Sequence, residues 1–213
     1  NIGAYGVEIK SSFHHLEALN VDTGEFEIFT AEDCQFGYRD SYFKREGKDR
    51  YIILRVFLNL TNKNHRLNTS YGAIERELER LGKEANIHSI SEAVVNIRRS
   101  KLPDPARIGN SGSFFKNPVV ELQKFQELKG RFPELVAYPA GENKMKLAAG
   151  WLIEQAGWKG YRKGDAGVHE KQALVLVNHG GASGKEIAEL SEQIRTSIIS
   201  TFDVELEREV NLI

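Results

Sequence analysis

One ten-residue segment, from Gly109 to Pro118, constrains the fold of this chain more than any other. It reads Gly-Asn-Ser-Gly-Ser-Phe-Phe-Lys-Asn-Pro. Glycine loosens the backbone and proline removes a hydrogen-bond donor, so the segment fits neither a regular helix nor a core strand. Glycine N–H groups can approach an anion closely, and Ser113, Lys116 and Asn117 add a hydroxyl, a positive charge and a carboxamide. The segment is either an anion-binding or proton-donating loop, or a surface turn whose phenylalanines fill the core.

The composition is that of a soluble globular protein without a marked charge. Of the 213 residues, 40% are hydrophobic and 28% are charged, and the formal net charge is −1. This length predicts one large or two small domains, and this charge predicts no general attraction to nucleic acid or membranes. Cys34 is the single cysteine, which excludes an internal disulfide, and the histidine spacing resembles no zinc site. No apolar run is long enough to span a membrane.

The first hundred residues predict strands before helices. Two apolar segments, residues 16–21 and 26–29, flank the turn sequence Asp22-Thr23-Gly24-Glu25, which predicts a hairpin. Residues 51–60 predict a further strand, because every even position is apolar and falls on one face.

Two helices are expected next. Residues 71–81 have apolar side chains at helical spacing, and residues 89–100 begin with Ser89 and Glu92, which resemble a capping box. Residues 101–105 contain two prolines and are the expected domain boundary.

The last hundred residues predict a second unit of strands and helices. A helix is expected at 146–157, a short buried strand at 173–177 and a strand at 204–213. Ser183 and Glu186 form another capping box, and apolar residues follow at helical spacing. Those residues are Ile187, Leu190, Ile194 and Ile198.

The expected terminal strand carries three acids on one face. Glu205, Glu207 and Glu209 recur at every second position, about 7 Å apart in a strand. Neighbouring carboxylates and burial both raise a carboxyl pKa, so one of these acids could stay neutral near pH 7 and donate a proton or a hydrogen bond. The alternative is a solvated strand face.

Several unusual blocks of this sequence resemble the UDP-N-acetylenolpyruvoylglucosamine reductase (MurB) family. The segment from Gly112 to Pro118 matches the family signature Gly-Ser-Phe-Phe-Lys-Asn-Pro. Other blocks match in the same order and span nearly the whole chain. They are residues 1–8, 36–41, 101–105, 146–153, 168–169 and 172–178.

The resemblance implies an α+β fold of two units. Residues 1–102 would be the C-terminal part of an FAD-binding domain of the vanillyl-alcohol-oxidase type, with a substrate lid near 62–72. Residues 103–213 would be the substrate-binding domain. About a hundred further residues, roughly one domain with a Gly-rich flavin loop, are expected before Asn1. The chain is thus interpreted as a C-terminal portion, which alone is expected to be inactive.

The implied activity is an oxidoreductase of peptidoglycan precursor synthesis. NADPH would reduce bound FAD, and UDP-N-acetylglucosamine enolpyruvate would become UDP-N-acetylmuramate in the cytoplasm. A monomer is expected, with no nucleic-acid, membrane or metal partner. The alternative is a module that binds the nucleotide sugar without turnover, because the sequence lacks the Gly-rich cofactor loop.

Three catalytic residues are implied. Arg39 would grip the enolpyruvyl carboxylate, since a guanidinium makes two parallel hydrogen bonds. Ser113 would donate the proton and Glu209 would help to polarise the carboxylate. Arg208 and Asn211 flank this acid where related enzymes often carry proline and arginine. From the residues alone, Arg39 could equally form an exposed ion pair with a nearby acid.

Binding residues are implied by the same matches. The substrate-binding positions are Tyr71, Lys101, Lys116 and Asn117. The cofactor-binding positions are Asn1, Ile2, Gly3, Ala4, Tyr5 and Gly6. Each has a plain structural alternative: Tyr71 as a core aromatic, the lysines as solvated charges, Asn117 as a turn residue, and the terminal segment as a simple turn. The hypothesis requires Arg39, Ser113 and Glu209 to meet in one pocket.

Overall fold

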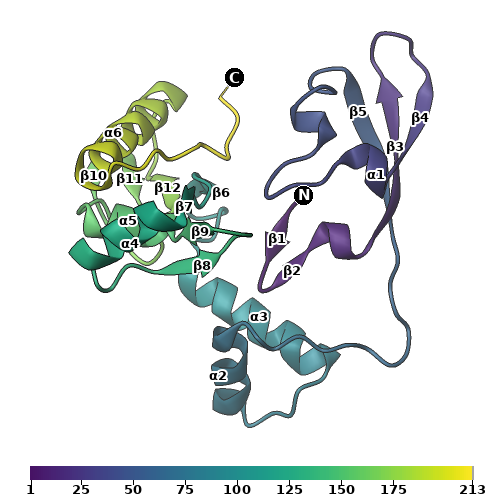
Figure 1. Cartoon of the computed structure of the whole chain (residues 1–213), viewed down its shortest axis with the longest axis horizontal. Coiled ribbons are helices and arrows are strands. Elements are labelled where there is room, and N and C mark those ends of the chain that lie inside the picture. The colour runs from purple at the N-terminus through teal and green to yellow at the C-terminus, as the bar shows by residue number, and fades with distance from the viewer. Residues whose placement is uncertain (213) are drawn as a thin grey trace. The chain divides into compact units, whose positions relative to one another are not determined.

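The computed structural model describes residues 1–212 and divides the chain into two compact units (Figure 1). The first unit is Asn1–Ile97, and the second begins at Arg98. Each unit combines small antiparallel sheets with helices, which confirms the predicted α+β class. Within residues 1–212, no helix has the length and apolar character that crossing a membrane requires.

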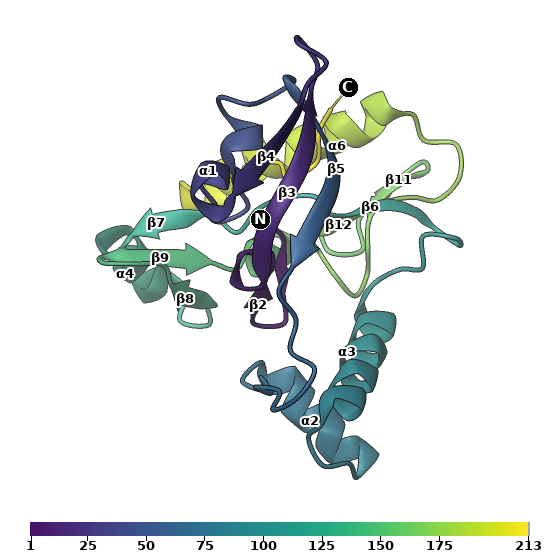
Figure 2. The same cartoon turned by 90° about the vertical axis from the view of Figure 1, so that its right-hand side faces the viewer.

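A three-stranded antiparallel sheet dominates the first unit (Figure 2). Its strands are β3 (Phe13–Asn20), β4 (Phe26–Thr30) and β5 (Tyr51–Leu58), in the order β4-β3-β5. The β3–β4 hairpin confirms the prediction, and Asn20 accepts hydrogen bonds from Asp22 and Thr23 to close its turn. Short elements complete this part of the chain. They are β1 (Gly3–Ala4), β2 (Val7–Glu8), α1 (Ala31–Cys34) and 3₁₀ turns at Ile9–Ser11 and Tyr42–Lys44.

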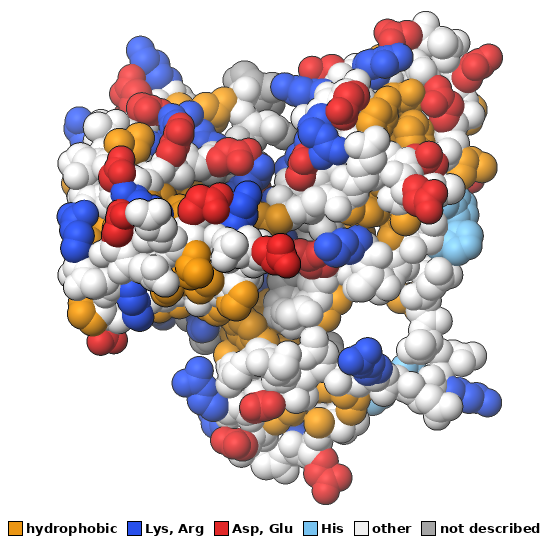
Figure 3. All heavy atoms as spheres, viewed as in Figure 1, with side chains coloured by type: hydrophobic (Ala, Val, Ile, Leu, Met, Phe, Trp, Pro, Cys, Tyr) orange, Lys and Arg blue, Asp and Glu red, His pale blue; other side chains and the backbone are white. Residues whose placement is uncertain are grey.

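Strand β5 lies at an edge of this sheet and exposes apolar side chains on both faces. Ile52, Leu54 and Val56 of one face are 53%, 48% and 45% exposed, and Ile53 and Phe57 of the other face are 45% and 38% exposed. Hydrophobic side chains accordingly reach the surface of this sheet in Figure 3. The alternation in the sequence therefore marks a strand, but it does not mark a buried face.

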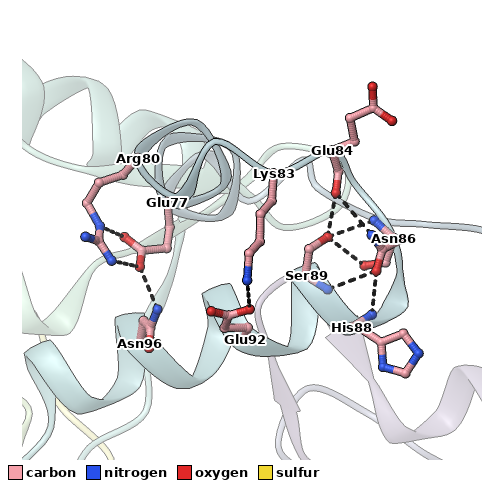
Figure 4. Close-up of polar contacts among 9 residues, drawn as sticks. All are labelled: Glu77, Arg80, Lys83, Glu84, Asn86, His88, Ser89, Glu92 and Asn96. Atoms are coloured by element: carbon pink, nitrogen blue, oxygen red, sulfur yellow. Dashed lines mark hydrogen bonds and ion pairs between the residues drawn. The ribbon is translucent and has the colours of Figure 1, made fainter.

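A helix pair, α2 (Gly72–Leu81) and α3 (Ile87–Lys101), packs around Ile74, Leu78, Ala93 and Ile97. Polar contacts also join the two helices, including an ion pair between Lys83 and Glu92 (Figure 4). The expected cap at Ser89 was wrong. The side-chain oxygen of Asn86 accepts from the N–H groups of His88 and Ser89, so the helix begins earlier, and the Ser89 hydroxyl donates to the Glu84 carbonyl.

Two sheets and three helices form the second unit. The four-stranded sheet has the order β10-β11-β12-β6 and the three-stranded sheet the order β7-β9-β8. Helix α6 packs against β11, β12 and α5 (Figure 1). The strands are β6 (Gly109–Ser113), β7 (Val119–Glu121), β8 (Ala137–Pro139), β9 (Lys144–Leu147), β10 (Arg162–Lys163), β11 (Ala166–Val168) and β12 (Val175–Asn178). The helices are α4 (Leu122–Arg131), α5 (Ala149–Gln155) and α6 (Gly184–Phe202).

One hydrophobic core holds the second unit together. Phe114 and Phe115 are each 1% exposed within it, beside Ile194 and Ile198 of α6. The capping box that opens α6 is present as predicted, with Ser183 and Glu186 each accepting a backbone N–H of the other. Helix α6 thus starts where the sequence indicates, and its apolar face packs against the core.

Two expected elements in this unit were wrong. The helix expected at 146–157 is shorter, because Lys144–Leu147 is strand β9, paired with both β7 and β8. The strand expected at 204–213 does not form among the described residues of that range, where a single bridge joins Arg208 to Phe115. Val204 and Leu206 are buried and Glu205 and Glu207 exposed, so the alternation reflects packing on α6.

Candidate functional site

The N-terminal turn is a two-residue hairpin. Ala4 pairs with Val7, and the loop residues Tyr5 and Gly6 have φ angles of 53° and 78°. Two positive φ angles are typical of a type I′ turn, and glycine adopts the second without strain. The turn exposes Ile2, Ala4 and Gly6, which carry no charge, so its surface fits contact with a flat, largely apolar ring system.

The structure brings Arg39 to this turn. Its Nη2 atom donates to the Gly3 carbonyl at 2.5 Å, and its guanidinium lies 5.3 Å from the centre of the Tyr38 ring. Arg39 itself has φ 54°, in the left-handed region. The Asn1 side chain donates to the Gly37 carbonyl at 2.9 Å, a second tie between the two segments. The predicted cofactor turn and the predicted carboxylate-binding arginine are therefore neighbours.

Tyr71 also lies at the turn. It immediately precedes α2, is 42% exposed, and meets the Tyr5 ring edge-on with centroids 5.2 Å apart. The Asn68 side chain donates to the Gly6 carbonyl at 3.2 Å. The loop expected to be a lid therefore contacts the predicted cofactor turn through two residues.

Ser113 closes β6 at the edge of the four-stranded sheet. Ser113 pairs with Val175 and Asn110 with Val177, so two β6 residues face one β12 residue in a β-bulge. Gly112 has φ 75° there, and the Asn110 side chain accepts its N–H. A bulge re-aims the side chain that follows it. Ser113 is exposed beside two buried phenylalanines, so its hydroxyl is presented by a fixed edge.

Glu209 is fastened to the same edge through the backbone. Its N–H donates to the Phe114 carbonyl at 2.9 Å, and the Lys116 N–H donates to the Glu207 carbonyl at 2.9 Å. These two bonds flank the Phe115–Arg208 bridge, as in an antiparallel pair. Ser113 and Glu209 thus lie on adjoining segments of one unit, although 96 positions separate 113 from 209 in the sequence.

The other predicted substrate residues already have partners or lie exposed. Lys116 forms an ion pair with Glu207. The Asn117 side-chain oxygen accepts the N–H of Ala149, the first residue of α5, at 2.9 Å. Lys101 is the exposed last residue of α3. Asn117 therefore has a structural role in starting α5, and its amide nitrogen is the group left to meet a ligand.

Two of the three terminal acids are exposed and form ion pairs. Glu205 pairs with Arg195 at 2.7 Å, and Glu207 with Lys116. The side chains of Glu205 and Glu207 are 73% and 70% exposed, which fits the alternative of a solvated face. Both Glu207 and Glu209 are tied by their backbones to the segment that carries Ser113, and of these two only Glu207 is paired with Lys116.

A cavity of about 840 Å³ in the second unit was not foreseen. Arg98, Arg99 and Arg107 line it together with His169, whose pKa is lowered by burial. Its lining includes Asn110 and Gly112 of β6 but not Ser113. Three guanidinium groups against one carboxylate suit an anionic ligand. The signal in the sequence was the Arg98-Arg99 pair just before the domain boundary.

The second unit has the geometry of an α+β domain in which backbone hydrogen bonds join the segment of Glu209 to the residues that follow Ser113. Arg39 belongs to the first unit, so its meeting with Ser113 and Glu209 stays a prediction. Within residues 1–212, no group of three or more His, Cys, Asp and Glu side chains is arranged to hold a metal ion.

Comparisons with known proteins identify this class. The chain belongs to the UDP-N-acetylenolpyruvoylglucosamine reductase family, because the model of that family's C-terminal domain matches residues 104–213. Reductases of this name from Flavobacterium johnsoniae and Pseudomonas aeruginosa are each 51% identical to it over its whole length. The chain spans 64% and 62% of the lengths of these two relatives.

A solved structure shares the fold. The reductase MurB from Thermus caldophilus has a TM-score of 0.60 and 23% sequence identity to this chain. The likeness covers 99% of this chain and 56% of that protein. At this identity the likeness supports the fold alone.

Proposed function

We propose that the gene product containing this chain reduces UDP-N-acetylglucosamine enolpyruvate to UDP-N-acetylmuramate, with FAD as bound cofactor and NADPH as reductant. Family membership supports the reaction class. The observation that carries the proposal is the hydrogen bond from the Glu209 N–H to the Phe114 carbonyl, because it joins the segment of Glu209 to the residue that follows the proposed proton donor. We place the activity in the cytoplasm and expect a monomer.

Ser113 is the proposed proton donor. Addition of hydride to one carbon of the enol ether leaves negative charge on the carbon next to the carboxylate. That carbon is a strong base, so a hydroxyl at close range can protonate it without being acidic beforehand. The β-bulge at Gly112 and the buried Phe114 fix the position of this hydroxyl. Lys116 and nearby backbone N–H groups would stabilise the resulting alkoxide.

Arg39 and Glu209 are proposed to act on the substrate carboxylate. The guanidinium would grip it with two hydrogen bonds, and a protonated Glu209 would donate a third. Together they would draw charge away from the double bond. This role requires that Arg39 exchange part of its contact with the Gly3 carbonyl for the substrate.

The bound flavin would supply the hydride chemistry, and Asn1–Gly6 would hold its ring. Tyr71, Lys101, Lys116 and Asn117 are the proposed contacts for the remainder of the substrate. Lys116 would leave Glu207 to meet the diphosphate. That exchange costs little, because the Glu207 side chain is 70% exposed and such ion pairs contribute about 1 kcal/mol or less.

The test compares two serines of one segment in the intact gene product. Ser113→Ala should leave flavin reduction by NADPH unchanged and slow flavin reoxidation by the enol ether about 100-fold or more, the usual effect of losing a proton donor. Ser111→Ala, two residues earlier, is the matched control and should behave as wild type. Anaerobic stopped-flow absorbance measures both half-reactions.

Equal reoxidation rates in the two variants would remove Ser113 from the mechanism. A colourless protein that binds the nucleotide sugar but does not oxidise NADPH would replace the proposal with the alternative of a non-catalytic binding module.

A further inference from the structure

The segment that carries Glu209 has little backbone support of its own. Helix α6 ends at Phe202, and Asp203 turns the chain with φ 52°. Among the described residues that follow, one bridge and two backbone hydrogen bonds join the segment to residues 114–116. An extended segment with one rung of pairing has a weakly specified register. Side chains must therefore determine where Glu209 lies.

Arg195 of α6 supplies the first side-chain anchor. Its Nε atom donates to the Leu206 carbonyl at 2.9 Å, and its Nη2 atom donates to Glu205 at 2.7 Å. This guanidinium holds the beginning of the segment along the helix. None of the described hydrogen bonds of Arg195 reaches Glu207 or Arg208, the two residues before Glu209.

Arg208 supplies the second anchor, next to Glu209. Its Nε atom donates to the Ser191 hydroxyl at 2.8 Å, and its Nη2 atom donates to Glu192. Ser191 is fully buried and in turn donates to the Ala188 carbonyl, so its oxygen is a fixed acceptor. Arg195 also donates to Glu192, and the bonds from Arg195 and Arg208 lower the pKa of that carboxyl group. The two arginines share one acid and form a single network on α6.

We propose that Arg208 is a positioning residue for Glu209. Successive side chains of an extended segment point to opposite sides, so fixing residue 208 on α6 directs residue 209 away from the helix. Arg208 also sits opposite Phe115 in the bridge, so the same contact fixes the register against the segment that carries Ser113. This inference rests on the function proposed above, in which Glu209 touches the substrate.

The decisive variants change how residue 208 is held. Arg208→Gln removes the bonds to Ser191 and Glu192. Arg208→Pro removes them too but fixes the backbone φ, and none of the described backbone hydrogen bonds uses the Arg208 N–H. Arg131→Gln is the matched control, because Arg131 also donates to α6, at the Thr201 carbonyl in its last turn, and none of its described hydrogen bonds reaches residues 204–212.

Hydrogen–deuterium exchange in the intact gene product provides a readout that does not depend on activity. Arg208→Gln should speed exchange at the Glu209 and Lys116 amides at least 10-fold and leave the Leu176 amide of β12 unchanged. Arg131→Gln should change neither segment amide. Unchanged exchange at Glu209 in Arg208→Gln would overturn the proposal, whether or not the protein proves to be a reductase.

Kinetics then separate positioning from general stability. Arg208→Gln should slow flavin reoxidation by the enol ether about 10-fold with flavin reduction unchanged, and Arg208→Pro should recover most of the lost rate. If Arg208→Pro restores slow exchange at the Glu209 amide but turns over as slowly as Arg208→Gln, the guanidinium acts by something other than position and the positioning role is excluded. The double variant Arg208→Gln/Ser191→Ala should be no slower than Arg208→Gln alone, because the two residues act as one contact. Additive losses would contradict that coupling.

Discussion

The two units of this chain hold their candidate residues by different means. In the second unit, eighteen buried residues form one core, and Ser113 and Glu209 are joined to it through the backbone at Phe114. In the first unit, the described buried residues form two clusters, of five and four. Arg39 and the N-terminal turn are joined by side-chain hydrogen bonds to backbone carbonyls.

This difference indicates how each site is specified. A large core fixes the second unit, so its candidate acid and hydroxyl are placed by packing. The first unit places its candidates through a hairpin turn and a few polar bonds, and β5 leaves apolar side chains exposed. We therefore expect the first unit to unfold more readily than the second. Both tryptophans, Trp151 and Trp158, lie in the second unit, so their fluorescence reports on it alone.

The largest expected contrast comes from one substitution made in both units. Leu176 of β12 is 2% exposed and Leu54 of β5 is 48% exposed. Leu176→Ala should lower the free energy of unfolding by about 2–5 kcal/mol, because it leaves a cavity in a packed core. Leu54→Ala should cost about 1 kcal/mol or less, since the side chain is half in solvent already. Urea unfolding followed by tryptophan fluorescence measures the first effect.

Exchange of the β5 amides measures the second effect. Equal losses for the two leucines would mean that β5 is covered in the intact protein, and the comparison between the units would fail.

Local signals in the sequence explain what could be predicted. The capping box at Ser183 and the hairpin turn after Asn20 depend on neighbours a few residues away, and both form as expected. The edge strand at Gly109–Ser113 was only half foreseen. The composition of this segment excluded a central strand, and β6 indeed lies at the edge of its sheet. The β-bulge at Gly112 could not be predicted, because it depends on pairing with β12, which is far along the chain.

Tertiary contacts explain what could not be predicted. The alternation after Val204 resembles a strand, yet it arises because one side of the segment packs on α6. Period-two burial requires only one packed face, whereas a strand also requires a hydrogen-bonded partner. The link between Ser113 and Glu209 was expected from family resemblance alone. Neither residue type nor spacing predicts the bond between Phe114 and Glu209.

Each unit contains one helix that opens with a capping box, formed by Thr30 and Asp33 at α1 and by Ser183 and Glu186 at α6, and the pair offers a smaller test of the same contrast. Ser183 opens α6, which has 19 residues, and Thr30 opens α1, which has four. Both hydroxyls accept an N–H at 3.3 Å. Ser183→Ala should cost about 1 kcal/mol, because α6 carries five buried residues and its first turn supports the core. Thr30→Ala should cost about 0.5 kcal/mol or less, since α1 buries only Cys34.

Thermal unfolding of both variants beside wild type checks these values. A larger loss for Thr30→Ala than for Ser183→Ala would reverse the assignment of the more robust unit.

The smallest expected effect is a pH dependence confined to the first unit. Hydrogen bonds from Arg80, and then from Asn96 of α3, lower the pKa of Glu77 from 4.5 to about 2 (Figure 4). A lowered carboxyl pKa in the folded state adds stability that is complete above about pH 4.5 and is lost as the pH falls toward 2. Glu77→Gln should remove this dependence from the exchange of the α2 and α3 amides, measured between pH 6 and pH 3.

Glu79→Gln, on the exposed face of the same helix, is the matched control and should keep the wild-type slope. If both variants keep it, the bond between Glu77 and Asn96 does not join the two helices in solution, and their packing depends on their other contacts, above all those of Ile74, Leu78, Ala93 and Ile97.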